Sequence, residues 1–102
     1  MSRLPPHTLK RYLDRPDAEL DLHGLTRIEA ESELRSFLDE ATSLNWTKVR
    51  IITGQGRNSA SGEAVLRNWA EGYLDSRGLR HQRAGYGQGG DGALDVFLRG
   101  RF

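Results

Sequence analysis

Strand-like and helix-like patterns of apolar residues alternate along this chain, and this alternation restricts its fold more than any other feature. Polar and apolar side chains alternate over residues 19–23, as in a half-buried strand. Two later stretches, beginning near residues 30 and 65, place apolar side chains at helical spacing with charges between them. Further strand patterns occupy residues 48–53, 79–84 and 93–98. The order β-α-β-α-β-β predicts a two-layer α/β sandwich with two helices on one face of a four-stranded mixed sheet.

Local signals mark the ends of both predicted helices. Thr26 and Glu29 form a capping box, which predicts the start of the first helix, and that helix is expected to end near Asn45. Gly78 is expected to end the second helix as its C-cap. The apolar stripe of this second helix, which we expect to face the core, consists of Val65, Leu66, Trp69 and Tyr73.

Length and composition indicate one ordinary globular domain. The chain has 102 residues, of which 36% are hydrophobic and 28% charged, so it can form a core without disulfides or metals. We predict an arm over residues 1–18, with a short helix over residues 7–13, and a folded domain over residues 19–102. The sequence shows no membrane span or signal peptide, and it contains no cysteine. These features predict a cytoplasmic protein, which we expect to be a monomer and either complete or part of a longer chain.

The charge distribution suggests one basic region. The formal net charge is only +1, which does not identify a partner. After residue 76, however, five arginines stand against two aspartates. We expect these arginines to form a positive surface beside His23, although ordinary solvated charge explains the composition equally well. The five are Arg77, Arg80, Arg83, Arg99 and Arg101.

The first strand ends with two side chains that can carry acid–base chemistry. Because residues two apart in a strand point to the same side, Asp21 and His23 are expected to project together, away from Leu20 and Leu22. A carboxylate beside an imidazole fixes its tautomer and raises its basicity, which suits proton transfer near neutral pH. Alternatively, the pair only stabilises the turn at Gly24, and Asp-x-His spacing by itself is more often of this structural kind.

Two glycine-containing loops follow later strands. Gly54-Gln55-Gly56, followed by Arg57, can bring backbone N–H groups close to a phosphate, although most such loops are simple turns. The loop lacks the residues of a Walker motif or a dinucleotide fingerprint. The loop over residues 89–92, with Gly90 and Gly92, is either a nucleic-acid contact or a hairpin connection. Trp46 is a weaker candidate for stacking on a base.

Three segments together resemble the Smr (small MutS-related) domain family. They are Leu20-Asp21-Leu22-His23-Gly24, Thr53-Gly54-Gln55-Gly56, and the run from Gly89 to Leu98. The resemblance covers about residues 19–99 and includes the order and intervals of the segments. It implies a two-layer α/β fold and endonuclease activity on DNA or on messenger RNA at stalled ribosomes. The sequence departs from the family pattern at Thr53, where histidine is frequent, and at Gln55, where lysine is frequent.

The resemblance implies a division of roles among these residues. Asp21 and His23 correspond to the family's Asp-x-His, with His23 as acid or base, and the phosphate is expected at Gly54, Gln55, Gly56 and Arg57, with Gly90 and Gly92 nearby. RNA cleavage would need no metal, whereas DNA cleavage would make a divalent cation such as Mg²⁺ or Mn²⁺ at Asp21 more plausible. The main alternative is a non-catalytic module that binds nucleic acid or the ribosome. A third is a protein-interaction domain.

Overall fold

The computed structural model describes residues 15–54, 62–84 and 92–98, which form a four-stranded sheet and two helices. The strands lie in the order β1-β2-β4-β3; β1 pairs with β2 in parallel, and the other two pairs are antiparallel. This is the mixed two-layer α/β fold predicted from the sequence. In chain order the elements are β1 (Ala18–Asp21), α2 (Arg27–Ser43), β2 (Lys48–Ile52), α3 (Gly62–Ser76), β3 (Arg80–Arg83) and β4 (Ala93–Phe97).

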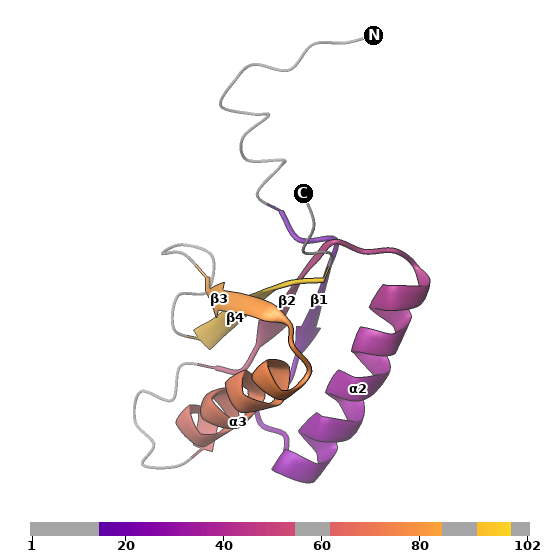
Figure 1. Cartoon of the computed structure of the whole chain (residues 1–102). Helices are drawn as coiled ribbons and strands as arrows, with labels where there is room; N and C mark the ends of the chain where they lie inside the picture. Colours follow the sequence, from indigo (N-terminus) through magenta and orange to yellow (C-terminus); the bar gives the residue numbers. More distant parts are fainter. Residues whose placement is uncertain (1–14, 55–61, 85–91, 99–102) are drawn as a thin grey trace, which may run out of the picture.

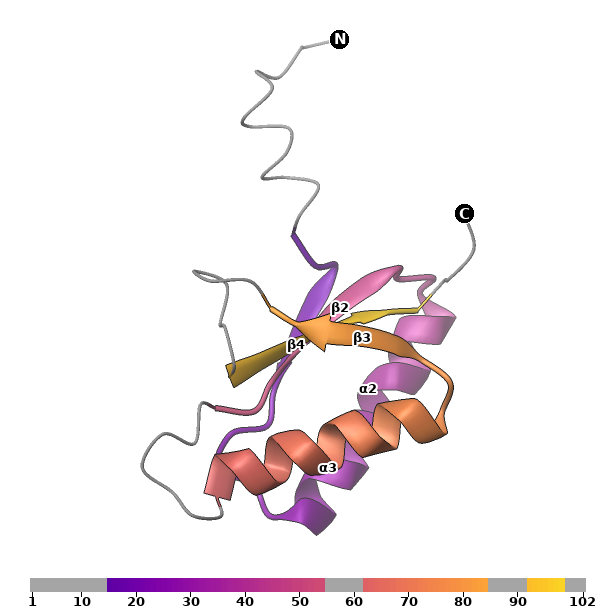
Figure 2. The same ribbon diagram turned by 60° about the vertical axis from the view of Figure 1, so that its left-hand side comes forward.

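Both helices cover the same face of the sheet (Figures 1 and 2). Alternate residues of the two central strands, such as Val49 in β2 and Val96 in β4, are fully buried beneath them. These residues form one hydrophobic cluster with Leu34 of α2 and Leu74 of α3. The intervening strand residues therefore project from the opposite side of the sheet, which we call the open face. No helix in the described part of the chain is long and apolar enough to span a membrane.

The first strand begins earlier and ends sooner than its sequence pattern predicted. It starts at Ala18 instead of residue 19, and Asp17 is already bound to the fold: its N–H donates to the carbonyl of Lys48 at 2.7 Å, and its Oδ2 accepts from the N–H of Thr47 at 2.7 Å. Asp17 and Ala18 thus belong to the folded unit and not to the arm. The predicted helix over residues 7–13 lies outside the described residues.

Both helices end as their sequences predicted. The Thr26 Oγ1 accepts from the N–H of Glu29 at 3.2 Å, and the Glu29 carboxylate accepts from the Thr26 N–H at 2.9 Å, which completes the capping box. Helix α2 is closed by Asn45 at φ +59°, and α3 is followed by Gly78 at φ +72°. The next N–H beyond each of these left-handed residues bonds five residues back, as in a Schellman cap.

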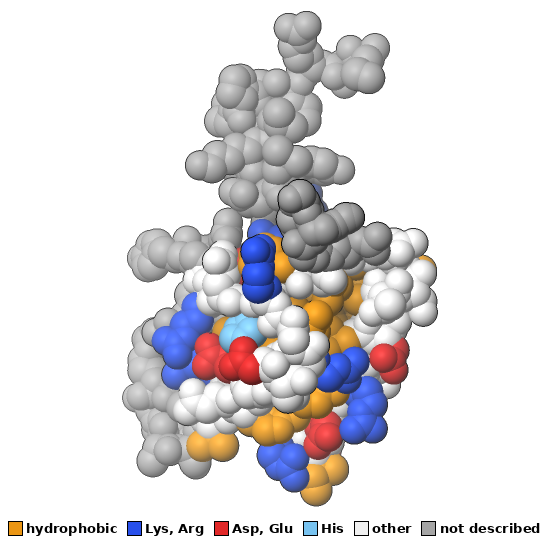
Figure 3. Space-filling model, viewed as in Figure 1, with side chains coloured by type: hydrophobic (Ala, Val, Ile, Leu, Met, Phe, Trp, Pro, Cys, Tyr) orange, Lys and Arg blue, Asp and Glu red, His pale blue; other side chains and the backbone are white. Residues whose placement is uncertain are grey.

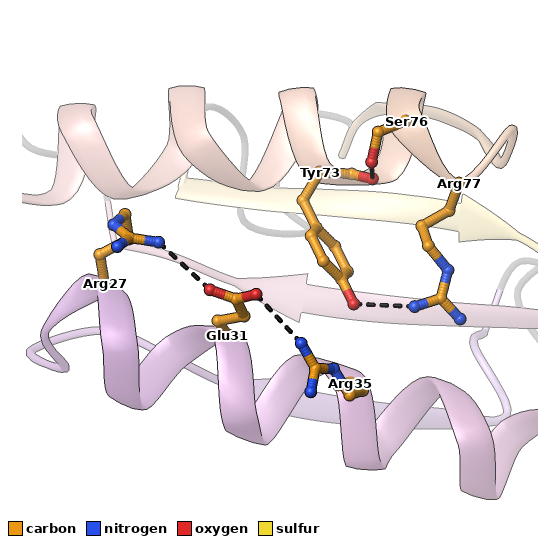
Figure 4. Close-up of polar contacts among 6 residues, drawn as sticks. All are labelled: Arg27, Glu31, Arg35, Tyr73, Ser76 and Arg77. Atoms are coloured by element: carbon orange, nitrogen blue, oxygen red, sulfur yellow. Dashed lines mark hydrogen bonds and ion pairs between the residues drawn. The ribbon is translucent and has the colours of Figure 1, made fainter.

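Polar side chains form hydrogen bonds within α2 and at the C-terminal end of α3 (Figure 4). Glu31 accepts hydrogen bonds from Arg27 at 3.2 Å and from Arg35 at 3.1 Å, all three on α2. From α3, the Tyr73 hydroxyl accepts from Arg77 at 2.8 Å. A hydrogen bond with Tyr73 of α3 raises the pKa of Arg35.

Both tryptophans are partly buried and pack against the hydrophobic core. Trp69 is partly buried against the core, as predicted, and stacks on Tyr73 with ring centroids 5.3 Å apart. Trp46 packs against Phe37 with centroids 5.7 Å apart. That contact accounts for an aromatic residue in this turn, and stacking of Trp46 on a base stays a prediction.

Candidate functional site

Asp21 and His23 form a hydrogen-bonded pair at the carboxyl end of β1. One carboxylate oxygen, Asp21 Oδ1, lies 2.8 Å from His23 Nδ1 and also accepts the backbone N–H of His23 at 3.0 Å. The side chains are 53% and 62% exposed, respectively. Leu22 between them is fully buried. The predicted alternation is therefore confirmed, and both polar side chains lie on the rim of the open face.

A tight turn fixes the position of His23. The N–H of Leu25 donates to the carbonyl of Leu22 at 3.1 Å, which closes a four-residue turn over His23 and Gly24. Gly24 has φ +82°, the conformation that the third residue of a type II turn requires. The turn and the two bonds to Asp21 together hold the imidazole without burying it.

The two hydrogen bonds from His23 also determine the protonation state of its partner. The side-chain bond contributes most and the backbone bond next, and together they lower the pKa of the Asp21 carboxyl. Both donors favour the ionised carboxylate. Near neutral pH, Asp21 is therefore a carboxylate that accepts from the imidazole.

Two further segments predicted to contribute to the site converge on this end of the sheet. Leu22 N–H donates to the carbonyl of Ile52 at 2.7 Å, and the N–H groups of Thr53 and Gly54 both donate to the carbonyl of Gly92, at 2.8 and 3.1 Å. The ends of β1 and β2 and the start of β4 thus meet at one end of the sheet. Gly54 has φ +88°, which explains why glycine is needed there.

The geometry changes the role expected for Gly54. Its N–H is bonded to Gly92, so it closes the loop and is not directed at a phosphate. Thr53 is fully buried, with its hydroxyl 3.3 Å from the carbonyl of Gly54 and 3.4 Å from that of Gly92. It therefore braces the same junction. The other residues predicted for phosphate binding, Gln55, Gly56, Arg57 and Gly90, lie outside the described residues.

The described arginines do not form the positive surface that we expected beside His23. Arg83 pairs with Glu71 of α3 at 3.4 Å, and Arg77 is bonded to Tyr73. Arg80 is paired in register with Phe97, opposite Lys48, at the far end of the sheet from Asp21. In the view of Figure 3, which looks onto α3, basic and acidic side chains are interspersed. Arg99 and Arg101 lie outside the described residues.

Sequence reasoning missed a buried ion pair in the centre of the open face. Arg50 of β2 donates from Nε to Asp95 Oδ1 of β4 at 2.7 Å, and its Nη1 lies 3.8 Å from Glu19 Oε2 of β1. Arg50 and Asp95 are only 8% and 3% exposed. The signal was present, because each is a charged residue at the middle of its strand with apolar residues on both sides.

The described residues offer few metal ligands. No group of three histidine, cysteine, aspartate or glutamate side chains within residues 15–54, 62–84 and 92–98 could hold a metal ion. Asp21 provides a single carboxylate at the site. The second described histidine, His81, lies on β3 and pairs with Asp75 of α3 at 2.7 Å.

Comparison with known proteins identifies the family. The model of the Smr domain family matches residues 20–99. An uncharacterised protein of Treponema pallidum is 33% identical over 87 residues, which are 82% of this chain and 42% of that protein. The endonuclease MutS2 of Carboxydothermus hydrogenoformans is 35% identical over 83 residues, which are 79% of this chain but 10% of that protein. This chain therefore corresponds to less than half of either relative.

Solved structures agree with this match. The Smr domain of Thermus thermophilus MutS2 is 32% identical and superimposes with a TM-score of 0.71, covering 80% of this chain and 98% of that domain. YdaL, a stand-alone small MutS-related protein from Escherichia coli, is 26% identical with a TM-score of 0.77, covering 97% of this chain and 79% of YdaL. With the family match spanning most of the folded residues, this chain belongs to the Smr domain family.

Proposed function

We propose that this Smr domain is an endonuclease that cleaves phosphodiester bonds in nucleic acid, with His23 as the general acid and base. The observation that carries the proposal is the exposed Asp21–His23 pair at 2.8 Å. Family membership supports it, because relatives with this domain are named MutS2 endonucleases. Asp21 is then a positioning residue: it holds Nδ1, so that proton transfer to and from the substrate passes through Nε2.

On RNA the chemistry can be completed by the imidazole alone. Nε2 removes the proton of a 2′-hydroxyl, the 2′-oxygen attacks the adjacent phosphorus, and the bond to the 5′-oxygen breaks. The imidazolium then returns a proton to the departing 5′-oxygen. The products are a 2′,3′-cyclic phosphate and a 5′-hydroxyl.

On DNA a water molecule must replace the missing 2′-hydroxyl as the nucleophile. His23 is again the described group that accepts its proton. A divalent cation such as Mg²⁺ or Mn²⁺ would supply further activation of this water when bound, and the Asp21 carboxylate would be one ligand for it. The two substrates are therefore distinguished by the ends that they leave.

The phosphate is proposed to lie at the loop that follows β2. Gly54 and Gly92 shape its base through their backbone bonds, and the proposal assigns phosphate contacts to Gln55, Gly56 and Arg57, with Gly90 nearby. Loops of this composition can direct successive N–H groups to an anion. Arg57 would supply the positive charge that the family often places as lysine at the position of Gln55.

Matched histidine variants test the assignment. The described residues include two His–Asp pairs, so His23→Gln can be compared with His81→Gln. Single-turnover cleavage of RNA and DNA oligonucleotides of the same sequence should fall by roughly 100-fold or more for His23→Gln, with affinity little changed. His81→Gln should cleave like wild type, because it lies on β3 near the other end of the sheet.

Two outcomes would contradict the proposal. If His23→Gln cleaves at the wild-type rate, His23 is not the acid or base. If the wild-type protein binds oligonucleotides or ribosomes in a salt-dependent way but never cleaves them, the domain is a binding module. Product ends decide between the substrates: a cyclic phosphate requires attack by a 2′-hydroxyl.

A further inference from the structure

A second group of side chains on the open face has a composition suited to a nucleic-acid strand. Lys48, Phe97 and Arg80 are partners in register across β2, β4 and β3. The Lys48 Nζ lies 6.0 Å from the centroid of the Phe97 ring, and the Arg80 guanidinium carbon lies 5.2 Å from it. One aromatic ring is therefore flanked by two cations, an arrangement that cation–π attraction stabilises.

This row lies on the same face as His23 and at the other end of it. Asp21 is paired in register with Ile52, four residues along β2 from Lys48. At about 3.3 Å per residue, the two ends are separated by about 13 Å along the strand. That length corresponds to about four stacked nucleotides at roughly 3.4 Å each.

The charges between the two ends favour a path over β4 and β3. In the centre, Arg50 is held by Asp95 and is almost completely buried, so its charge is largely neutralised within the sheet. Asp95 Oδ2 also lies 3.9 Å from Lys48 Nζ, so Arg80 is the more available cation of the row. Glu19 adds a 51% exposed carboxylate at the β1 edge, which repels phosphates. Arg80, on the opposite edge strand, is exposed, and Phe97 beside it is partly exposed.

We propose that the open face is a platform for single-stranded nucleic acid, which runs from His23 across β4 to the row formed by Lys48, Phe97 and Arg80. Phosphates contact Lys48 and Arg80, while bases lie on the Arg80 guanidinium and the Phe97 edge. The inference rests on the proposed function, since it assumes that the substrate at His23 is nucleic acid. To the proposed function it adds the location of the nucleotides that lie outside the cleavage site.

Two arginines of β3 provide a matched test, because residues 80 and 83 lie on opposite faces of the same strand. Arg80 is on the open face over Phe97, whereas Arg83 is on the helix side with Glu71. Binding of a 5′-labelled single-stranded 16-mer is measured by fluorescence anisotropy between about 50 and 200 mM salt. Arg80→Gln should weaken binding about 3- to 10-fold and reduce the salt slope by about one; Arg83→Gln should change neither.

Length dependence and a second variant complete the test. A dinucleotide should bind wild type and Arg80→Gln more nearly alike than the 16-mer does, because at about 3.4 Å per stacked nucleotide it cannot span the distance from His23 to the row. Phe97→Leu keeps an apolar side chain and should weaken binding of the 16-mer about 3-fold or more through lost stacking. Thermal melting of each variant confirms that the fold is retained.

The inference is overturned if Arg80→Gln and Arg83→Gln bind alike, or if Arg80→Gln binds like wild type. Neither result depends on cleavage, so a failure of the platform is separate from a failure of the catalytic proposal. If wild type does not cleave but Arg80→Gln still weakens binding, the platform stands and only the role of His23 falls. If an acidic peptide binds the open face and the oligonucleotide does not, the open face is a protein interface and the inference is wrong.

Discussion

Asp21 uses one oxygen, Oδ1, to accept from both the side chain and the backbone of His23. Because these bonds lower the pKa of Asp21, the carboxylate form is stabilised in the folded protein relative to the unfolded chain. The contribution to stability is therefore fully present above the unfolded pKa, about 3.9. It is lost as the pH falls through the lower, folded value.

Titration of the Asp21 carboxyl by NMR tests this account. In wild type the midpoint should lie below that of an ordinary aspartate. In His23→Ala it should rise only part of the way to the ordinary value, because the larger side-chain bond is lost while the backbone N–H is retained. A midpoint that does not move in His23→Ala would show that the imidazole does not bind Asp21 in solution.

Variants at Gly24 and Gly78 distinguish the role of the turn at the site from the effect of backbone strain in general. Both have positive φ, and a Cβ added at either would meet no atom within 4 Å. Alanine at each position should therefore cost about 1 kcal/mol in the free energy of unfolding, for conformational reasons alone. Only Gly24→Ala should also reduce cleavage, because it alters the turn that holds His23.

Urea denaturation and single-turnover cleavage are the two measurements for this pair. Similar destabilisation with a cleavage defect confined to Gly24→Ala supports the positioning role of the turn. Equal loss of cleavage in both variants would mean that activity follows overall stability, and the turn would have no separate role.

Among the elements, α2 begins directly after the His23 turn, and its capping box anchors that junction. Thr26→Ala removes the side-chain acceptor for the Glu29 N–H, so we expect a loss of about 1 kcal/mol in the free energy of unfolding. Thr26→Ser keeps the acceptor and should cost much less. The measurement is urea denaturation of both variants beside wild type, and equal losses would show that the missing methyl group matters more than the cap.

Elements governed by neighbouring residues could be predicted from the sequence, whereas contacts between distant strands could not. The capping box, the left-handed end at Gly78 and the meeting of Asp21 with His23 each depend on residues at most a few positions apart. The position of Arg80 depends on which strand β3 joins, and that is set by its pairing with β4. A count of arginines after residue 76 therefore predicted charge correctly but not its location.

Arg50 and Asp95 illustrate the same limit at the scale of one interaction. They lie 45 positions apart in the sequence and meet only because β2 and β4 are antiparallel neighbours. Their burial marks each as an unusual polar position within its strand, but neither strand identifies the partner, and open sheet faces are ordinarily solvated.

For the molecule as a whole, this ion pair joins the two central strands on the side that no described helix covers. Asp95→Ala would leave the Arg50 guanidinium buried with its strongest partner removed, which typically costs about 3–5 kcal/mol. Arg50→Met and Asp95→Leu together remove both charges and fill the space with apolar atoms. The double variant should therefore lose much less free energy of unfolding than the summed losses of the single variants Arg50→Met and Asp95→Leu.

A double-mutant cycle by urea denaturation measures that difference. A coupling energy of about 2 kcal/mol or more would show that the two positions must be of the same kind, either both charged or both apolar. Additive losses would mean that Arg50 is stabilised by its other neighbours, with Glu19 at 3.8 Å the first to test. The double variant also separates folding from binding: if it is stable yet binds the 16-mer normally, the central charges serve the sheet, and the nucleic acid depends on the outer row at Lys48 and Arg80.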